Sequence, residues 1–286
     1  MHSNTCHKIS RLGLLQESID QKLRWVPPRT YTSRLAKPRY TIIDMKHLHV
    51  CFVIPAFNEG EGIDNFILNI NKEFKDSKVL FIVVDDNSTD NTQLKLNRIR
   101  NSVNLKIIKN EINLGHGYSL SKGYYAAVEY MVDYVIAVDG DSQFSPKQIY
   151  ELYKSGQNSH LTIGIRKYNA QKLFYRKVVT FFSKIIFFFF YGKYSRDINS
   201  PLRIMTKHFL NDFLRSLNKS ALIPNILMTA YATKSHIQTK TFNVEVSRRV
   251  GLNSQGTSWG SGSLPSIKFL KFIFKSFNEF VSYRLM

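Results

Sequence analysis

The sequence predicts an α/β fold in which helices cover both faces of a mixed, mainly parallel β-sheet. Short apolar runs of strand length alternate along the chain with stretches that repeat apolar residues at helical spacing. The strand-length runs are apolar at successive positions, which is typical of strands buried on both faces. The chain has 286 residues, of which 43% are hydrophobic, and this is enough for one large or two small domains.

The predicted elements alternate regularly between residues 49 and 166. Strands are predicted at 49–57, 78–86, 105–110, 134–141 and 160–166. Helices are predicted between them at 61–75, 88–100, 113–131 and 145–156. The last of these helices is opened by Pro146, because proline is common in the first turn of a helix. Each strand is thus followed by a helix, as in units that build a parallel sheet.

The second half of the chain is predicted to be less regular. A basic, aromatic helix is expected at 171–191, then a turn at 196–206 and a helix that ends near residue 217. Residues 238–249 alternate like a strand, and 251–263 form a polar loop rich in Gly and Ser. We expect three parts: a loosely ordered basic extension (1–44), a main domain (45–259) and an amphipathic helix (260–286). Met45 is an alternative start of the protein.

The composition favours anionic partners. The formal net charge is +19 and the isoelectric point is near 9.8. Residues 166–219 alone carry twelve Lys or Arg and two acidic residues, a net charge of +10. Two cysteines and no zinc-binding spacing suit a reducing compartment. No signal peptide or transmembrane span is expected, because the most apolar window, 178–191, is interrupted by Lys184 and is shorter than the ~20 residues of a span.

Polar side chains follow three of the predicted strands. They are Pro55, Asn58 and Glu59 after the first strand, Asp85, Asp86 and Asn87 after the second, and Asp139, Asp141 and Gln143 after the fourth. In parallel sheets ligands bind at the carboxyl ends of the strands, so these groups are expected to share one site. The sequence has no glycine-rich dinucleotide-binding motif after the first strand and no P-loop motif. These absences argue against a Rossmann dinucleotide site and against a P-loop nucleotide site.

The segment "VDGDSQ" predicts a metal site. Two carboxylates, Asp139 and Asp141, and the amide oxygen of Gln143 are hard oxygen ligands, which suit Mg²⁺ or Mn²⁺. Such an ion would neutralise the charge on a leaving diphosphate. Gly140 between the carboxylates is expected to allow a tight turn and to leave space for the ligand.

Four segments carry a resemblance to a known family. "VIPAFNEGEGI", "VVDDNSTDNT", "NLGHGYSLSKGYYAA" and "VDGDSQFSP", in this order and spacing, resemble family-2 glycosyltransferases of the GT-A fold. Within that family the chain looks most similar to polyprenyl-phosphate sugar transferases, the group of dolichyl-phosphate mannose synthase. The resemblance covers about residues 49–259 and implies a Rossmann-like GT-A domain.

The resemblance also implies roles on the donor side. The residues that would line the nucleoside pocket are Pro55, Phe57 and Glu59, and Asp86 would contact the base or ribose. The metal and diphosphate would be held by Asp139 and Asp141, with Gln143 completing the metal shell. The donor diphosphate would also meet Arg248 or Arg249 of "SRR". His116 is an alternative diphosphate ligand, or a solvated loop residue. Asp85 is expected to support its turn.

On the acceptor side the resemblance implies a set of cations. Arg166 of "TIGIR" would hold a phosphate, and Arg176 and Thr180 match positions that bind the acceptor's phosphate. The segment "DINSPLR" contributes Asp197, Ser200 and Arg203. One departure concerns the family's G-x-S-K segment, where this chain has Trp259 in place of Lys. Donor preference therefore stays open.

The chemical class of the acceptor is predicted from the scarcity of candidate general bases in the sequence. Sugar transfer to a hydroxyl needs a general base, and between Asp197 and Glu245 the chain offers only Asp212. A phosphate monoester is already anionic and needs cations instead. We therefore expect an inverting transfer from a UDP- or GDP-sugar to a polyprenyl phosphate.

The C-terminal segment is expected to place the enzyme on a membrane. Its apolar stripe consists of Ile267, Leu270, Phe274, Phe277 and Val281, and lysines flank it. Such a helix can lie on an anionic membrane surface, and the alternative is packing against the protein itself. We expect peripheral attachment at the cytoplasmic face and a role in cell-envelope glycan synthesis.

Three other functions stay open. The first is a glycosyltransferase acting on a sugar or protein hydroxyl, with Asp197 or Asp212 as base. The second is a nucleotidyltransferase, although "PAFNEGEG" lacks the basic residue of that loop. The third is a basic protein that binds membranes or nucleic acid through a vestigial site. The favoured hypothesis, a polyprenyl-phosphate glycosyltransferase, involves no nucleic acid. The sequence leaves the oligomeric state undetermined.

Overall fold

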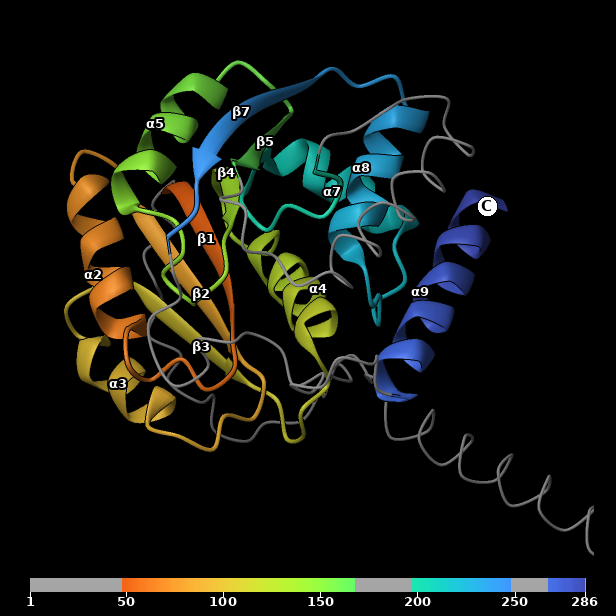
Figure 1. Cartoon of the computed structure of the whole chain (residues 1–286). Helices are drawn as coiled ribbons and strands as arrows, with labels where there is room; N and C mark the ends of the chain where they lie inside the picture. Colours follow the sequence, from red (N-terminus) through yellow and green to blue (C-terminus); the bar gives the residue numbers. More distant parts are fainter. Residues whose placement is uncertain (1–47, 168–196, 248–266, 286) are drawn as a thin grey trace, which may run out of the picture. The chain divides into compact units, whose positions relative to one another are not determined.

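The computed structural model describes residues 48–167, 197–247 and 267–285, and these form one seven-stranded sheet with helices on both faces (Figure 1). The strands are β1 (Leu48–Ala56), β2 (Val79–Asp85), β3 (Leu105–Lys109), β4 (Val132–Ala137), β5 (Leu161–Lys167), β6 (Arg203–Thr206) and β7 (Thr239–Glu245). The helices are α2 (Ile63–Glu73), α3 (Thr92–Ile99), α4 (His116–Ala127), α5 (Pro146–Gly156), α7 (Lys207–Ser216), α8 (Pro224–Lys234) and α9 (Ile267–Leu285). The predicted fold class is confirmed.

The order of the strands is β3-β2-β1-β4-β6-β5-β7. β1 pairs in parallel with both β2 and β4, and β5 pairs in parallel with β7. β6 is antiparallel to β4 and to β5. The chain moves outward from β1 to β3 and then returns to place β4 on the other side of β1. This reversal is a topological switch point, where α/β sheets bind their ligands.

The two faces of the sheet build two cores. On β1, Cys51 and Val53 face one core and Phe52 and Ile54 face the other. The first core packs against α4, α7, α8 and α9, and the second packs against α2, α3 and α5. Figure 1 shows α2, α3 and α5 on the opposite side of the sheet from α4, α7 and α8. Because successive residues of a strand point to opposite faces, a strand between two helical layers must be apolar throughout.

Two elements differ from the sequence prediction. Residues 196–206 were expected to form a turn, but Arg203–Thr206 is the antiparallel strand β6 between β4 and β5. α8 was not predicted at all. Its polar residues, among them Asn225 and Thr229, are mixed with apolar ones around the helix, so its sequence gives no amphipathic pattern to recognise. The predicted extension 1–44, the helix 171–191 and the loop 251–263 lie outside the described residues.

Helix α9 is attached to the first core through one face. Phe280 and Tyr283 are buried, and the Tyr283 hydroxyl lies 2.8 Å from the hydroxyl of Ser216. The Glu279 carboxylate accepts hydrogen bonds from the backbone N–H groups of Leu222 and Ile223, immediately before α8. None of the helices in the described ranges is long and apolar enough to cross a membrane.

The face of α9 that packs does not include Phe274 and Phe277, two residues of the predicted apolar stripe. Of that stripe, Phe274 and Phe277 are exposed, at 66% and 41% of their surface. They lie on the outer side of the helix with Lys271 and Lys275, which are also exposed. The helix is therefore apolar on two faces, and folding buries only one of them.

Glu279 makes the stability of the protein depend on pH. Burial raises the pKa of this carboxyl above its ordinary value, and the hydrogen bonds from Leu222 and Ile223 only partly oppose that effect. The folded state therefore keeps the proton to a higher pH than the unfolded state. This contribution to stability is complete below the unfolded pKa, about 4.3, and is lost as the pH rises through the folded pKa.

We expect Glu279→Gln to remove this dependence, because an amide oxygen still accepts both N–H groups but does not ionise. The melting temperature of the variant relative to the wild type should rise between pH 4 and pH 7, about the range in which glutamate titrates. Thermal unfolding followed by circular dichroism measures it, with the exposed Glu151→Gln on α5 as a matched control. A difference that stays constant or shrinks with rising pH would contradict the prediction.

Candidate active site

The candidate site lies at the carboxyl edge of β1, β2 and β4. These three strands are adjacent and parallel, so the segments that follow them leave the sheet at the same edge. Two backbone hydrogen bonds connect the strand ends: Val138 N–H donates to Val53, and Asp86 N–H donates to Ala56. The expectation that the three polar strand ends share one edge is confirmed.

Asp139 and Asp141 form an acidic turn immediately after β4. The side chain of Asp139 is 20% exposed, whereas Asp141 is buried. The Asp141 Oδ1 accepts a hydrogen bond from the N–H of Gln143 at 3.2 Å, which fixes the direction of that carboxylate. The turn therefore presents one carboxylate near its surface and a second one beneath it.

Gly140 lies in a turn, as predicted, but its backbone conformation is not one that requires glycine. The left-handed conformation in this turn belongs to Ser142, with φ of 58°, and not to Gly140. A Cβ atom at Gly140 would meet its nearest neighbours at 3.4 Å, which is ordinary contact. The protein itself therefore tolerates a side chain at this position, and space for a ligand at Gly140 stays a prediction.

His116 joins the acidic turn to helix α4. Its Nε2 lies 2.7 Å from Oδ1 of Asp139, and it is the first residue of the helix. Gly115 precedes it with φ of 94°, a conformation that favours glycine. The sequence offered His116 either as a diphosphate ligand or as a solvated loop residue. The structure adds a third role, that of a partner for one of the two acidic side chains.

The chain after β7 also reaches the acidic turn. The N–H of Ser247 donates a hydrogen bond of 2.9 Å to the carbonyl of Gln143. Arg248 and Arg249 follow at once in the sequence but lie outside the described residues. Their contact with a donor diphosphate stays a prediction, and Ser247 is the last described residue before them.

The segments after β1 and β2 are bound to each other. Asn58 has φ of 55°, and its side-chain oxygen accepts from the N–H of Thr89 at 2.8 Å. The N–H of Glu59 donates to the hydroxyl of Thr92, also at 2.8 Å. Phe57 is 37% exposed and Pro55 forms part of β1. These hydrogen bonds give the loop after β1 a defined conformation. The nucleoside contacts of Pro55, Phe57 and Glu59 stay a prediction.

Asp86 is a buried centre of hydrogen bonds. Its Oδ1 accepts from the Asn110 amide and from the N–H of Leu114, and its Oδ2 accepts from the N–H of Gly115. The carboxylate thus holds the loop that leads to His116. Its predicted contact with the base or ribose stays a prediction. Asp85, by contrast, supports its own turn as expected, because its Oδ1 accepts from the N–H of Ser88.

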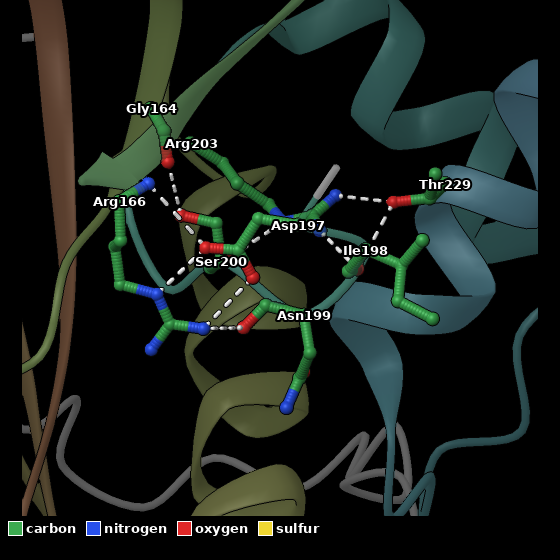
Figure 2. A network of polar contacts seen from close by, with 8 residues as sticks. All are labelled: Gly164, Arg166, Asp197, Ile198, Asn199, Ser200, Arg203 and Thr229. Carbon is green, nitrogen blue, oxygen red and sulfur yellow. Dashed lines mark hydrogen bonds and ion pairs between the residues drawn. The ribbon is translucent and has the colours of Figure 1, made fainter. Parts of the chain in front are cut away.

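Arg166 and Asp197 form an ion pair with two hydrogen bonds (Figure 2). Arg166 Nε lies 2.7 Å from Oδ2 of Asp197, and Arg166 Nη2 lies 2.8 Å from Oδ1. The Arg166 side chain is 22% exposed, whereas that of Asp197 is 9% exposed. Two residues from different parts of the predicted acceptor side are therefore in direct contact.

A direct contact between Arg203 and an acceptor phosphate, as predicted, does not fit the structure. Arg203 is completely buried, and its guanidinium donates to the carbonyls of Ile198 and Ser200 and to the hydroxyl of Thr229 (Figure 2). Burial lowers the pKa of this guanidinium to about 10. Arg176 and Thr180, the other predicted acceptor ligands, lie outside the described residues.

The described residues contain no group of three or more His, Cys, Asp or Glu side chains that could hold a metal ion. The donor set of the acidic turn still fits a divalent cation, because two carboxylates supply hard oxygen ligands and a diphosphate would supply others. Asp141 is buried, and a buried carboxylate favours a nearby cation.

Comparison with known proteins assigns the family. Residues 51–216 match Glycosyl transferase family 2, which covers more than half of the chain. The chain belongs to this family. It is therefore a glycosyltransferase, and the acidic turn lies within the matched residues.

Two curated relatives are similar in sequence. An uncharacterized protein of Methanocaldococcus jannaschii is 33% identical over 176 residues, which are 56% of this chain and 72% of that protein. The undecaprenyl-phosphate 4-deoxy-4-formamido-L-arabinose transferase of Proteus mirabilis is 26% identical over 190 residues, which are 65% of this chain. The match spans 57% of the length of that transferase.

A solved structure confirms the fold. The glucosyl-3-phosphoglycerate synthase of Mycobacterium tuberculosis aligns with a TM-score of 0.57 at 16% identity, over 84% of this chain and 81% of its own. The same synthase in complex with Mn²⁺, UDP and glucosyl-3-phosphoglycerate aligns with a TM-score of 0.53 at 16% identity, over 88% of this chain and 87% of its own. At this identity the likeness concerns the GT-A fold alone.

The start of α4 generates a prediction about stability. A Cβ atom on Gly117 would lie 1.9 Å from the carbonyl oxygen of Leu222, a backbone atom that cannot move aside easily. We expect Gly117→Ala to lower the free energy of unfolding by about 1–3 kcal/mol, the usual effect of overpacking. Urea denaturation measures it. Gly140→Ala is the matched control and should leave the stability unchanged, and equal losses in both variants would contradict the geometry.

Proposed function

We propose that this glycosyltransferase transfers a sugar from a UDP- or GDP-sugar to a polyprenyl phosphate, with inversion at the anomeric carbon and with a requirement for Mg²⁺ or Mn²⁺. The single observation that carries the proposal is the ion pair between Arg166 and Asp197. This ion pair engages Asp197, the best-placed candidate for a general base. It also holds the cation of Arg166 in one position.

A hydroxyl acceptor would require one of two carboxylates as base. Both oxygens of Asp197 already accept hydrogen bonds from Arg166. Asp212 lies on α7, where it pairs with His208 and Arg215 of the same helix. A phosphate monoester needs no base, because its oxygen is already anionic. A guanidinium that is oriented by a carboxylate is a suitable partner for it, because hydrogen bonds from a charged donor to a phosphate are among the strongest in proteins.

The reaction that we propose forms one bond and breaks one. A phosphate oxygen of the acceptor attacks the anomeric carbon of the donor sugar, and the bond from that carbon to the diphosphate breaks, with its electron pair leaving on the nucleoside diphosphate. Arg166 would orient the attacking phosphate, and Arg176 would assist it. A divalent cation, when bound by Asp139, Asp141 and Gln143, would neutralise charge on the leaving group. Arg248 or Arg249 would add to this neutralisation.

The donor nucleoside would lie over the loop after β1. Pro55, Phe57 and Glu59 would line its pocket, and Asp86 would contact the base or ribose. The hydrogen bonds between this loop and the segment after β2 give the pocket a defined shape before the donor binds. A site that is already in its binding conformation loses less entropy on binding.

Two comparisons support the proposal. The relative from Proteus mirabilis is named as an undecaprenyl-phosphate sugar transferase, and the synthase from Mycobacterium tuberculosis has been seen with Mn²⁺ and UDP. The acceptor class and the metal that we propose for this chain are inferred from those names. A cytoplasmic active site at the membrane surface, in cell-envelope glycan synthesis, is part of the same proposal.

Helix α9 is the part of the chain that we assign to the membrane. Its outer face carries Phe274 and Phe277, which are exposed, with Lys271 and Lys275 beside them. Aromatic side chains can enter the headgroup region while lysines pair with anionic lipids. The enzyme would then meet its lipid-borne phosphate at the surface of the bilayer.

The transfer reaction tests the proposal directly. The assay offers a panel of UDP- and GDP-sugars with polyprenyl phosphate and Mg²⁺ or Mn²⁺. We expect Asp141→Asn to lower kcat by about 100-fold or more. Asp197→Asn should raise the KM of the acceptor while kcat falls by less than about tenfold, because loss of a true general base costs about 100- to 10,000-fold.

The pair Asp197→Asn and Asp212→Asn separates the two acceptor classes. Neither variant should abolish transfer if the acceptor is a phosphate. A collapse of kcat in either one, with the KM of the acceptor unchanged, would show that a hydroxyl is the acceptor and that the altered residue is its base.

The membrane assignment predicts a loss of binding to vesicles. The double variant Phe274→Ser, Phe277→Ser should bind vesicles that contain an anionic phospholipid at least about tenfold less tightly, because each buried Phe contributes about 1.5–3 kcal/mol. Sedimentation with vesicles measures it. Leu94→Ser is the control, since Leu94 is equally exposed at 54% but lies on α3. Unchanged binding of the double variant would contradict the assignment.

A further inference from the structure

Arg203 occupies an unusual place for an arginine. It lies on β6, opposite Ala137 of β4 and Ile163 of β5, and none of its surface is exposed. Within the described part of the chain its hydrogen bonds go to two carbonyls and one hydroxyl, and none of them goes to a carboxylate. A buried cation without a directly bonded anion is costly, and an apolar residue of similar size would fill the same space at lower cost. A purely packing role therefore leaves the choice of Arg unexplained.

The hydrogen bonds of Arg203 converge on one turn, residues 197–200, which we call the acceptor turn. Arg203 Nε donates to the carbonyl of Ser200 at 2.9 Å, and Nη2 donates to the carbonyl of Ile198 at 2.7 Å. Nη1 donates to the hydroxyl of Thr229 on α8, also at 2.9 Å. The single proton of that hydroxyl has two acceptors within reach, the carbonyl of Asn225 at 3.1 Å and the carbonyl of Ile198 at 3.3 Å; Figure 2 draws the second. A planar, forked side chain can hold both carbonyls at once, which a single ammonium group cannot do in the same geometry.

The acceptor turn in its turn holds Arg166. Asp197, at the start of the turn, makes both hydrogen bonds of the ion pair, and the carbonyl of Asn199 accepts a third bond from Arg166 Nη2 at 3.4 Å. The hydroxyl of Ser200 donates to the carbonyl of Gly164, which fixes the turn to β5, the strand that carries Arg166. The orientation of the Arg166 side chain therefore depends on the turn, and the turn depends on Arg203.

We propose that Arg203 is a positioning residue for the acceptor: it fixes the acceptor turn, and through Asp197 and Asn199 it fixes the guanidinium of Arg166. The inference rests on the proposed function, since it assumes that Arg166 meets the acceptor phosphate. Arg203 itself touches neither substrate. Its removal loosens Arg166 without removing any charge from the surface of the site.

Kinetics of three variants test the inference with the full-length protein and polyprenyl phosphate. Arg203→Met fills the space and removes the fork, so the KM of the acceptor should rise about tenfold, the effect of losing one hydrogen bond to a charged group. The KM of the nucleotide sugar should not change. Arg203→Lys keeps the charge but not the fork, and it should show the same rise. Full recovery of the wild-type KM in Arg203→Lys would overturn the inference.

A milder pair of variants covers the case in which Arg203 variants fail to fold. Thr229→Val removes one partner of Arg203 and of the acceptor turn, and it should raise the KM of the acceptor several-fold, by about the effect of one neutral hydrogen bond. Thr233→Val is the matched control, because Thr233 lies one turn further along α8 and, among the residues that the structure describes, its hydroxyl bonds only to the carbonyl of Thr229. It should leave both KM values unchanged.

The outcomes separate this inference from the proposed function. Variants that lower only the melting temperature or kcat, with the KM of the acceptor unchanged, would show that Arg203 is merely structural while transfer to the phosphate stands. A wild-type enzyme that transfers only to a hydroxyl would overturn the proposed function. In that case the KM of the hydroxyl acceptor would be measured for the Arg203 and Thr229 variants. If this KM did not change, the positioning role of Arg203 would be overturned as well.

Discussion

The two hydrogen bonds between Arg166 and Asp197 determine what the acceptor side of this glycosyltransferase can do. A carboxylate that accepts two bonds from a guanidinium has both oxygens engaged and is poorly suited to take a proton from an alcohol. The same pair holds a partly exposed cation in one orientation. The site therefore has the chemistry to bind an anion on this side, and the proposed phosphate acceptor follows from that asymmetry. In our proposal the buried Arg203 fixes the geometry of this pair through the acceptor turn.

The donor side depends on the topology of the sheet. Because β4 returns to the other side of β1, the acidic turn and the loop after β1 leave the sheet side by side. Negative charge collects there although the chain as a whole carries +19. His116 and the segment that begins at Ser247 approach the acidic turn from two other elements. In the proposed reaction the carboxylates of the acidic turn would serve the diphosphate of the donor, and the guanidinium of Arg166 would serve the acceptor.

Much of this arrangement could be predicted from the sequence. The parallel strands were recognisable because they are apolar throughout, and Asp139 and Asp141 stood out because carboxylates end such a run. β6 was missed because four residues between a turn and a helix have no period of their own. The burial of Arg203 could not be predicted, since burial depends on β4, β5 and α8 together. For α9 the predicted apolar stripe left out Phe280 and Tyr283, the residues that pack, because the sequence could not tell which of the two apolar faces would be buried.

The central claim, that the acceptor is a phosphate and needs no base, is tested most directly by comparing two lipids of the same length as acceptors. One is the polyprenyl phosphate and the other is the corresponding polyprenol, each with the preferred nucleotide sugar and divalent cation. The account predicts a glycosyl phosphate from the first lipid and no product from the second, because Asp197 and Asp212, the two candidate bases, are both held in ion pairs. Comparable turnover of the polyprenol would contradict it and would return Asp197 or Asp212 to the role of general base.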